Sequence, residues 1–167
     1  MTGYVNAACT LNSWQSFQTT DGTPMKSELI LFLDFDGVLH PDPPQSTAPL
    51  MCRASLLQEW LALNPQVAVV ISSTWRLKRT LTELQMLFPL WGERMVGVTP
   101  NIPQANYQRQ HECESWMREH SKPWVPWLAL DDRAWNFRPF EKRLILTDRN
   151  TGLVDADVVR LSNASRL

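Results

Sequence analysis

Hydrophobic and polar residues alternate in blocks along most of the chain. Five short, mainly apolar runs occupy residues 29–33, within a predicted strand over 28–34, and residues 67–71, 95–98, 127–130 and 144–146. Runs of this length that contain β-branched residues predict buried strands of a parallel sheet. Between them, apolar residues recur at helical spacing, which predicts helices over residues 54–63, 77–88, 109–120 and 153–161.

The order of these elements predicts an α/β fold. Strands that alternate with helices form parallel sheets with right-handed crossovers. We therefore expect a single Rossmann-like domain of three layers, with a central parallel sheet of about five strands, over residues 28–167. Residues 1–27 are polar and end in a turn signal around Gly22 and Pro24, so they are interpreted as an N-terminal extension without an assigned role.

Composition narrows the function classes. The formal net charge of −1 gives no sign that the surface as a whole is basic, as it is in many nucleic-acid-binding proteins. A local basic cluster is formed by Arg76, Lys78 and Arg79. No stretch approaches eighteen consecutive apolar residues and the N-terminus has no basic leader, so we expect neither membrane insertion nor export.

The cysteines point to the reducing cytoplasm. They are odd in number and widely spaced, which argues against both a disulfide framework and a zinc site. They are Cys9, Cys52 and Cys113.

Polar residues of complementary type follow three of the predicted strands. Asp34 and Asp36 follow the first, Ser72 the second, and Asp131 and Asp132 the fourth. The carboxyl ends of parallel strands share one edge of a sheet, so these residues should converge there. Carboxylates beside hydroxyl donors suit Mg²⁺. Taken alone, Asp-x-Asp-Gly is also typical of a turn or a calcium loop, and Ser72 could cap a helix.

These three strand ends resemble motifs of the haloacid dehalogenase (HAD) superfamily of phosphohydrolases. Asp34-Phe35-Asp36-Gly37-Val38 resembles its first motif, Val69-Val70-Ile71-Ser72 its second, and Leu128-Ala129-Leu130-Asp131-Asp132 its fourth. The third motif is a lone basic residue, for which Arg109 is our choice and Lys122 and Lys78 are rivals. More narrowly, the segments 72–76, 109–116 and 130–133 resemble small HAD domains of bacterial proteins linked to RNA repair.

The resemblance implies a different role for each of the acidic residues. Asp34 would be the nucleophile that becomes an aspartyl-phosphate, and Asp36 the general acid and base. Mg²⁺ would bind Asp34, the backbone carbonyl of Asp36 and Asp132, with Asp131 at the edge of the metal shell.

It also implies roles for the polar and basic residues. Ser72 would donate a hydrogen bond to a phosphoryl oxygen, and Arg109 would neutralise developing charge. Ser73 and Arg76 would contact the substrate, although Arg76 could also lie on an exposed helix face.

The spacing of the motifs leaves no room for a cap domain. Only 35 residues separate Asp36 from Ser72. A capless HAD site is open and suits a large phosphorylated substrate, such as a nucleic-acid end or a phosphoprotein. Trp75 or Trp135 could stack on bases there, or pack in the core.

We therefore expect a cytoplasmic, Mg²⁺-dependent phosphomonoester hydrolase. Two alternatives stay open: a phosphotransferase, and a non-catalytic module that binds phosphorylated partners through the same pocket. The sequence does not address the oligomeric state.

Overall fold

A computed structural model describes residues 28–166, so the expected extension over residues 1–27 lies outside the described residues. Five strands form one parallel sheet in the order β3-β2-β1-β4-β5. The strands are β1 (Leu29–Leu33), β2 (Val67–Ile71), β3 (Met95–Val98), β4 (Trp127–Asp131) and β5 (Leu144–Leu146). This topology confirms the predicted α/β fold of the Rossmann-like type.

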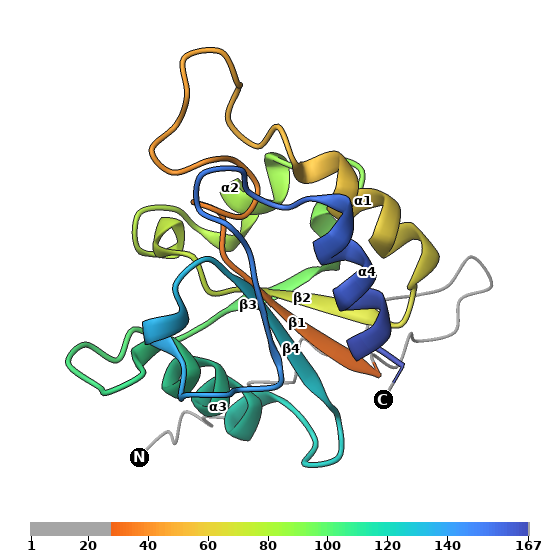
Figure 1. The fold of residues 1–167 in the computed structure, drawn as a ribbon. Helices are drawn as coiled ribbons and strands as arrows, with labels where there is room; N and C mark the ends of the chain where they lie inside the picture. Colours follow the sequence, from red (N-terminus) through yellow and green to blue (C-terminus); the bar gives the residue numbers. More distant parts are fainter. Residues whose placement is uncertain (1–27, 167) are drawn as a thin grey trace, which may run out of the picture.

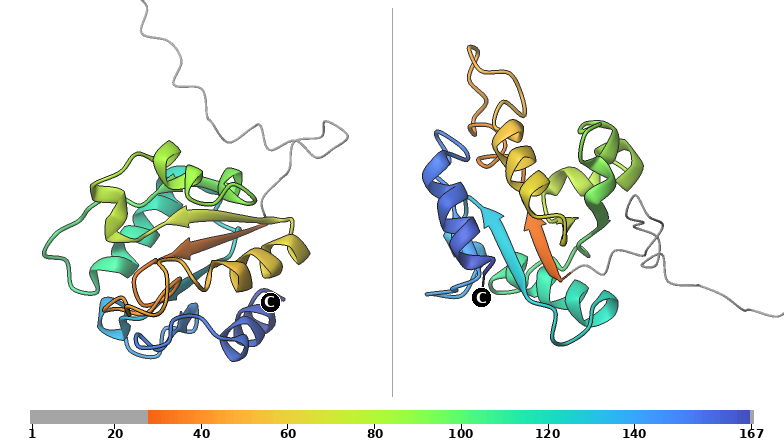
Figure 2. Two further views of the ribbon diagram at one scale, coloured as in Figure 1. Left: turned by 90° about the horizontal axis from the view of Figure 1, so that it is seen from above. Right: turned by 90° about the vertical axis from the view of Figure 1, so that its right-hand side faces the viewer.

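Helices cover both faces of the sheet (Figures 1 and 2). The α-helices are α1 (Ala54–Leu63), α2 (Leu81–Met86), α3 (Gln108–His120) and α4 (Asp155–Ala164). Short 3₁₀ turns occupy η1 (Thr74–Leu77), η2 (Gly92–Arg94) and η3 (Ala134–Asn136). Helices α1, α2 and α4 pack on one face and α3 on the other, which gives the three layers.

Both faces of the central strands are buried, which explains why the sequence shows continuous apolar runs. In β1, Leu31 and Leu33 face the core that contains α1 and α4, whereas Ile30 and Phe32 face the core that contains α3. Every residue of β1, β2 and β4 is buried. A strand that is covered on both sides loses the polar alternation of a half-exposed strand.

The helix predicted over residues 77–88 is wrong in detail. The chain instead forms the 3₁₀ turn η1, breaks, and begins again as the short helix α2. A capping box starts α2, because the Thr80 hydroxyl accepts from the Glu83 N–H and the Glu83 carboxylate accepts from the Thr80 N–H. Leu77, the first apolar residue of the predicted helix, is 54% exposed.

The segments that follow β1 and β2 contain no additional domain. The chain between β1 and α1 contains turns and bends, and the chain between β2 and β3 contains only η1, α2 and η2. No helix among residues 28–166 is long and apolar enough to cross a membrane.

Candidate active site

Three aspartates meet where β1 and β4 end. Oxygen atoms of Asp34, Asp131 and Asp132 lie within 4.8 Å of one another, and all three side chains are buried. The pairing of the strands brings them together, because β1 lies beside β4 and the Asp34 N–H donates to the Leu130 carbonyl at 3.0 Å. The strand order reverses between these two strands, which is where open α/β sheets bind ligands.

Several oxygen atoms of the aspartate cluster lack a hydrogen bond within the described residues. Oδ2 of Asp131 and both carboxylate oxygens of Asp132 are buried without a hydrogen bond. Arg133 and Arg149 approach Asp132 only to 3.6 Å and 3.9 Å. Burial, reinforced by the charge of Asp34, raises the pKa of Asp131 to about 8 and also raises that of Asp132.

Such an arrangement suits a cation. Buried carboxylates that repel one another and have free oxygen atoms favour a hard divalent ion. The donor set, three carboxylates with open oxygen positions, fits Mg²⁺.

Gly37 lets the loop after β1 pass close to this cluster. Its φ angle is +74°, and a Cβ at this position would lie 2.5 Å from Oδ2 of Asp132. The Thr147 hydroxyl, which follows β5, donates to the Gly37 carbonyl at 2.8 Å. A residue with a side chain would therefore displace Asp132, which explains the glycine.

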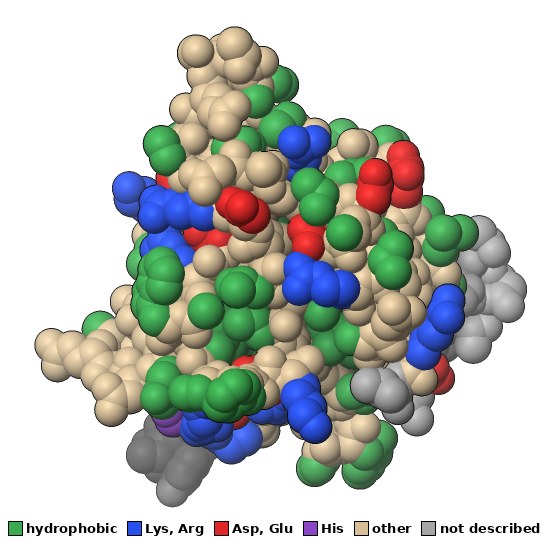
Figure 3. Space-filling model, viewed as in Figure 1, with side chains coloured by type: hydrophobic (Ala, Val, Ile, Leu, Met, Phe, Trp, Pro, Cys, Tyr) green, Lys and Arg blue, Asp and Glu red, His purple; other side chains and the backbone are tan. Residues whose placement is uncertain are grey.

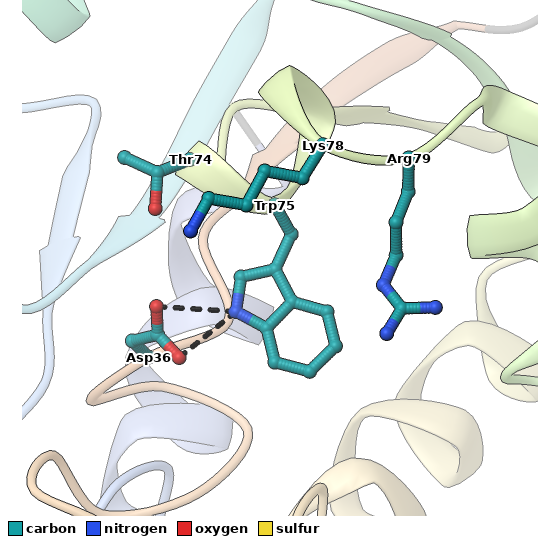
Figure 4. Close-up of a pocket in the computed structure, with 5 residues that line it drawn as sticks. All are labelled: Asp36, Thr74, Trp75, Lys78 and Arg79. Atoms are coloured by element: carbon teal, nitrogen blue, oxygen red, sulfur yellow. Dashed lines mark hydrogen bonds between the residues drawn. The ribbon is translucent and has the colours of Figure 1, made fainter.

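The carboxylate of Asp36 lies apart from the three clustered aspartates. The indole N–H of Trp75 donates to its two oxygens at 3.1 Å and 3.2 Å (Figure 4). Nε2 of His40 lies 3.1 Å from Oδ1, and the Asp36 side chain is 28% exposed. Asp34 is thus buried against other carboxylates, whereas Asp36 reaches the surface and accepts hydrogen bonds from the Trp75 indole.

Ser72 and Ser73 form the loop after β2, beside β1. The backbone N–H of Ser72 donates to the Leu33 carbonyl at 2.9 Å, and the Ser72 side chain is buried. The Ser73 hydroxyl accepts from the Trp75 N–H at 3.4 Å and caps η1. The helix cap that the sequence allowed for Ser72 is therefore provided by Ser73, and Ser73 is fully buried.

Arg109 reaches the aspartates from the first turn of α3. Its Nη2 lies 3.9 Å from Oδ2 of Asp34 and its Nε 3.7 Å from Oδ2 of Asp131, while Nη1 is buried without a hydrogen bond. Burial lowers the pKa of Arg109, but the charges of Asp34 and Asp131 raise it by more, so the guanidinium stays charged. Of the two rivals, Lys122 follows the far end of α3 and Lys78 lies beside Asp36.

A comparison with known families agrees with this geometry. Residues 30–158 match the model of a family described as "HAD domain in Swiss Army Knife RNA repair proteins". The chain belongs to this family. The matched range begins in β1 and ends in α4, so it contains the whole sheet and all of the acidic residues above. It confirms the resemblance to small capless HAD domains. Searches of curated proteins and of solved structures gave no match.

In this HAD domain, Arg76 is bound to the protein itself. Its five N–H donors contact the carbonyl oxygens of Ser72, Ser73, Thr99 and Pro100 and the carboxylate of Glu112. None remains for a phosphate, which differs from the substrate contact suggested by the sequence. Arg76 instead ties the loop after β2 to the loop after β3.

Glu112 connects Arg76 to Arg109. Its side chain is buried, and Oε2 lies 2.7 Å from Nη2 of Arg76 and 4.0 Å from Nε of Arg109. The other oxygen accepts from the Ile102 N–H and from the Gln108 amide. One carboxylate thus lies close to two buried guanidinium groups, that of Arg76 in η1 and that of Arg109 in α3.

Replacing Glu112 by glutamine should destabilise the HAD domain strongly. The substitution keeps the shape but leaves buried Arg76 without its carboxylate partner, while Arg109 keeps Asp34 and Asp131 nearby, and breaking a buried ion pair costs about 3–5 kcal/mol. Glu114→Gln is the matched control on the same helix, since its partners Arg138 and Arg143 are largely exposed and the loss should be below about 1 kcal/mol. Urea denaturation measures both; equal losses would contradict the assignment.

Three residues of this region were not identified from the sequence as part of the site: Trp75, His40 and Glu112. The sequence suggests for Trp75 only stacking on nucleic-acid bases or packing in the core. His40 does not have the sequence spacing of a metal ligand. His40 lies four residues after Asp36 and Glu112 three after Arg109, so helical spacing was the available signal for Glu112. Trp135, the other tryptophan considered for stacking, lies in η3 and is 66% exposed.

Proposed function

We propose that this HAD domain is a Mg²⁺-dependent phosphomonoesterase that acts through an aspartyl-phosphate on Asp34, with phosphorylated nucleic-acid ends as substrates. One observation carries the proposal: buried Asp34, Asp131 and Asp132 converge at the sheet edge where Asp36 reaches the surface, and Oδ2 of Asp131 and both carboxylate oxygens of Asp132 have no hydrogen bond there. The family description, which names RNA repair proteins, supports nucleic acid over other large substrates.

The first step transfers the phosphoryl group to the protein. A carboxylate oxygen of Asp34 attacks phosphorus and forms an O–P bond, while the bond from phosphorus to the leaving oxygen breaks. Asp36, in its protonated form, gives its proton to that leaving oxygen. The buried N–H groups of Arg109, which lack a hydrogen bond at Nη1, are placed to bind the charge on the phosphoryl oxygens.

The second step releases inorganic phosphate. Asp36, now a carboxylate, takes a proton from a water molecule that attacks the phosphorus of the aspartyl-phosphate, and the O–P bond to Asp34 breaks. The hydrogen bonds from the Trp75 indole would hold the Asp36 carboxylate for this proton transfer, with Nε2 of His40 3.1 Å from it. Asp34, Asp131 and Asp132 would hold Mg²⁺, which when bound would reduce the repulsion between the carboxylates and an anionic substrate.

Phosphate release tests the proposal directly. With Mg²⁺, the purified protein should release phosphate from p-nitrophenyl phosphate and from oligonucleotides that carry a 3′ or 5′ phosphate. Product analysis with added alcohols or nucleosides separates hydrolysis from transfer to an acceptor. A structure with Mg²⁺ and beryllofluoride should show the beryllium bonded to a carboxylate oxygen of Asp34, in the place of phosphorus. Absence of phosphate release from every substrate, where a control HAD enzyme is active, contradicts the proposal.

Replacing Trp75 by phenylalanine should reduce kcat by about tenfold, because Asp36 loses the N–H that orients it and general acid–base catalysis is worth about 10²–10⁴ in rate. KM for p-nitrophenyl phosphate should change little. Steady-state kinetics should show no such loss for Trp135→Phe, whose ring is exposed. A Trp75→Phe protein with unchanged kcat would exclude this positioning role.

A further inference from the structure

A pocket of about 360 Å³ opens beside the Asp36 carboxylate. It is lined by Asp36, Thr74, Trp75, Lys78 and Arg79. Four of the five residues come from η1 and the two positions after it, so the break between η1 and α2 forms its wall. On the face shown in Figure 3, basic side chains lie next to acidic ones.

The two cations of this pocket have no counter-ion within ion-pair distance in the described part of the chain. Neither Lys78 nor Arg79 forms an ion pair there, whereas Arg76 and Arg109 contact carboxylates. The Arg79 guanidinium carbon lies 5.3 Å from the centroid of the Trp75 ring. In Figure 4 the Lys78 ammonium and the Arg79 guanidinium flank the indole, whose N–H is turned to Asp36.

The charges of the pocket favour an anion. Asp36 is its one acidic residue, and that carboxylate is already bound by Trp75 and His40. Lys78 and Arg79 therefore leave an excess of positive charge, next to a threonine hydroxyl that can also donate a hydrogen bond. Lysine ammonium and arginine guanidinium groups are the usual side-chain contacts of phosphate oxygens.

The position of the pocket indicates which anion. A terminal phosphate that reacts at Asp34 has Asp36 at its leaving oxygen, and the rest of the substrate continues from that oxygen. The pocket begins at Asp36. In a polynucleotide the next anionic group along the chain is the adjacent phosphodiester, whereas a phosphoprotein has no obligatory charge at the corresponding place.

We infer that this pocket binds the phosphodiester next to the terminal phosphate of a polynucleotide, with Lys78 and Arg79 as its contacts. This inference rests on the proposed function for the terminal phosphate and adds a second binding site to it. The enzyme then selects ends of chains over mononucleotides, because only the former present two phosphates in series.

A pair of substrates that differ only in one charge tests this. Diuridylates with a 3′ or 5′ phosphate are compared with the same compounds that carry a neutral methylphosphonate linkage. The wild type should have a kcat/KM about tenfold higher for the charged linkage, since each of two exposed charge contacts contributes about threefold. In Lys78→Ala/Arg79→Ala this ratio should approach one. Lys142→Ala and Arg118→Ala, which remove exposed charges elsewhere, should keep it.

Binding to the Asp34→Asn protein separates this inference from the proposed function. If labelled charged diuridylate binds it more tightly than the neutral analogue, and the double substitution removes the difference, the pocket assignment stands even where the wild type releases no phosphate. A wild type that releases the terminal phosphate equally fast from the charged and the neutral compound overturns it. So does a phosphoserine peptide with uncharged neighbours that is hydrolysed as efficiently as the charged diuridylate by the wild type.

Discussion

The Asp34→Asn protein should release phosphate from p-nitrophenyl phosphate at least about 10⁴-fold more slowly than the wild type, because an amide cannot form the aspartyl-phosphate. The substitution should leave the fold intact. Oδ1 of Asp34 accepts from the Phe35 N–H at 2.8 Å, and an asparagine oxygen can do the same. Removing the charge of Asp34 also reduces the electrostatic repulsion on Asp131 and Asp132. Burial is the largest cause of the raised pKa values of these two residues, and the charge of Asp34 is the second.

Thermal unfolding without metal provides the control for this result. The Asp34→Asn protein should have a Tm equal to or above that of the wild type, so that lost activity cannot be ascribed to unfolding. Asp155→Asn, an exposed position at the start of α4, should keep full activity. Residual activity of more than about one hundredth of the wild-type rate would exclude Asp34 as the nucleophile.

Removal of Mg²⁺ with a chelator should reduce phosphate release to the background rate, and added Mg²⁺ should restore it. The three buried carboxylates otherwise repel an anionic substrate. Asp132→Asn should raise the Mg²⁺ concentration for half-maximal activity by at least about tenfold. Activity that persists after exhaustive chelation would contradict the proposed metal dependence.

The metal-free protein should lose stability as the pH rises. Burial and the charge of Asp34 raise the pKa of Asp131 to about 8, whereas an unfolded aspartate titrates near about 4. Between these values the folded state holds a proton that the unfolded state releases, so the free energy of unfolding falls with increasing pH. Asp131→Asn should reduce this slope and leave only the contribution of Asp132, whose pKa burial and the charge of Asp34 also raise, and Mg²⁺ should raise Tm more at pH 7.5 than at pH 5.

Most of the fold could be predicted from the sequence, because the sheet is buried on both faces. Five apolar runs correspond to five strands, and α1 begins and ends where its apolar periodicity does. The prediction over residues 77–88 was wrong because apolar spacing gives no sign of where a helix is interrupted. The capping box of Thr80 and Glu83 was the local signal, and it lies inside the predicted helix.

The candidate site, too, could be predicted from the sequence only in part. The convergence of Asp34 with Asp131 and Asp132 follows from any parallel sheet in which β1 and β4 are neighbours. The contacts of Arg76 do not follow from the sequence, since they depend on the path of the loop that contains Thr99 and Pro100. The bond from Trp75 to Asp36 joins residues 39 positions apart and depends on how η1 turns after Ser73.

The central place of β1 has a consequence for biosynthesis. Leu31 pairs with Val69 of β2 on one side and with Leu128 of β4 on the other. During synthesis β1 therefore pairs with β2 before β4 is available. Asp131 and Asp132 join Asp34 only when β4 docks. A chain emerging from the ribosome can therefore gather the three carboxylates only after Asp131 and Asp132 have been synthesised and β4 has paired with β1. Until then Asp34 lies at the end of a sheet that lacks β4, without the two aspartates that complete the cluster.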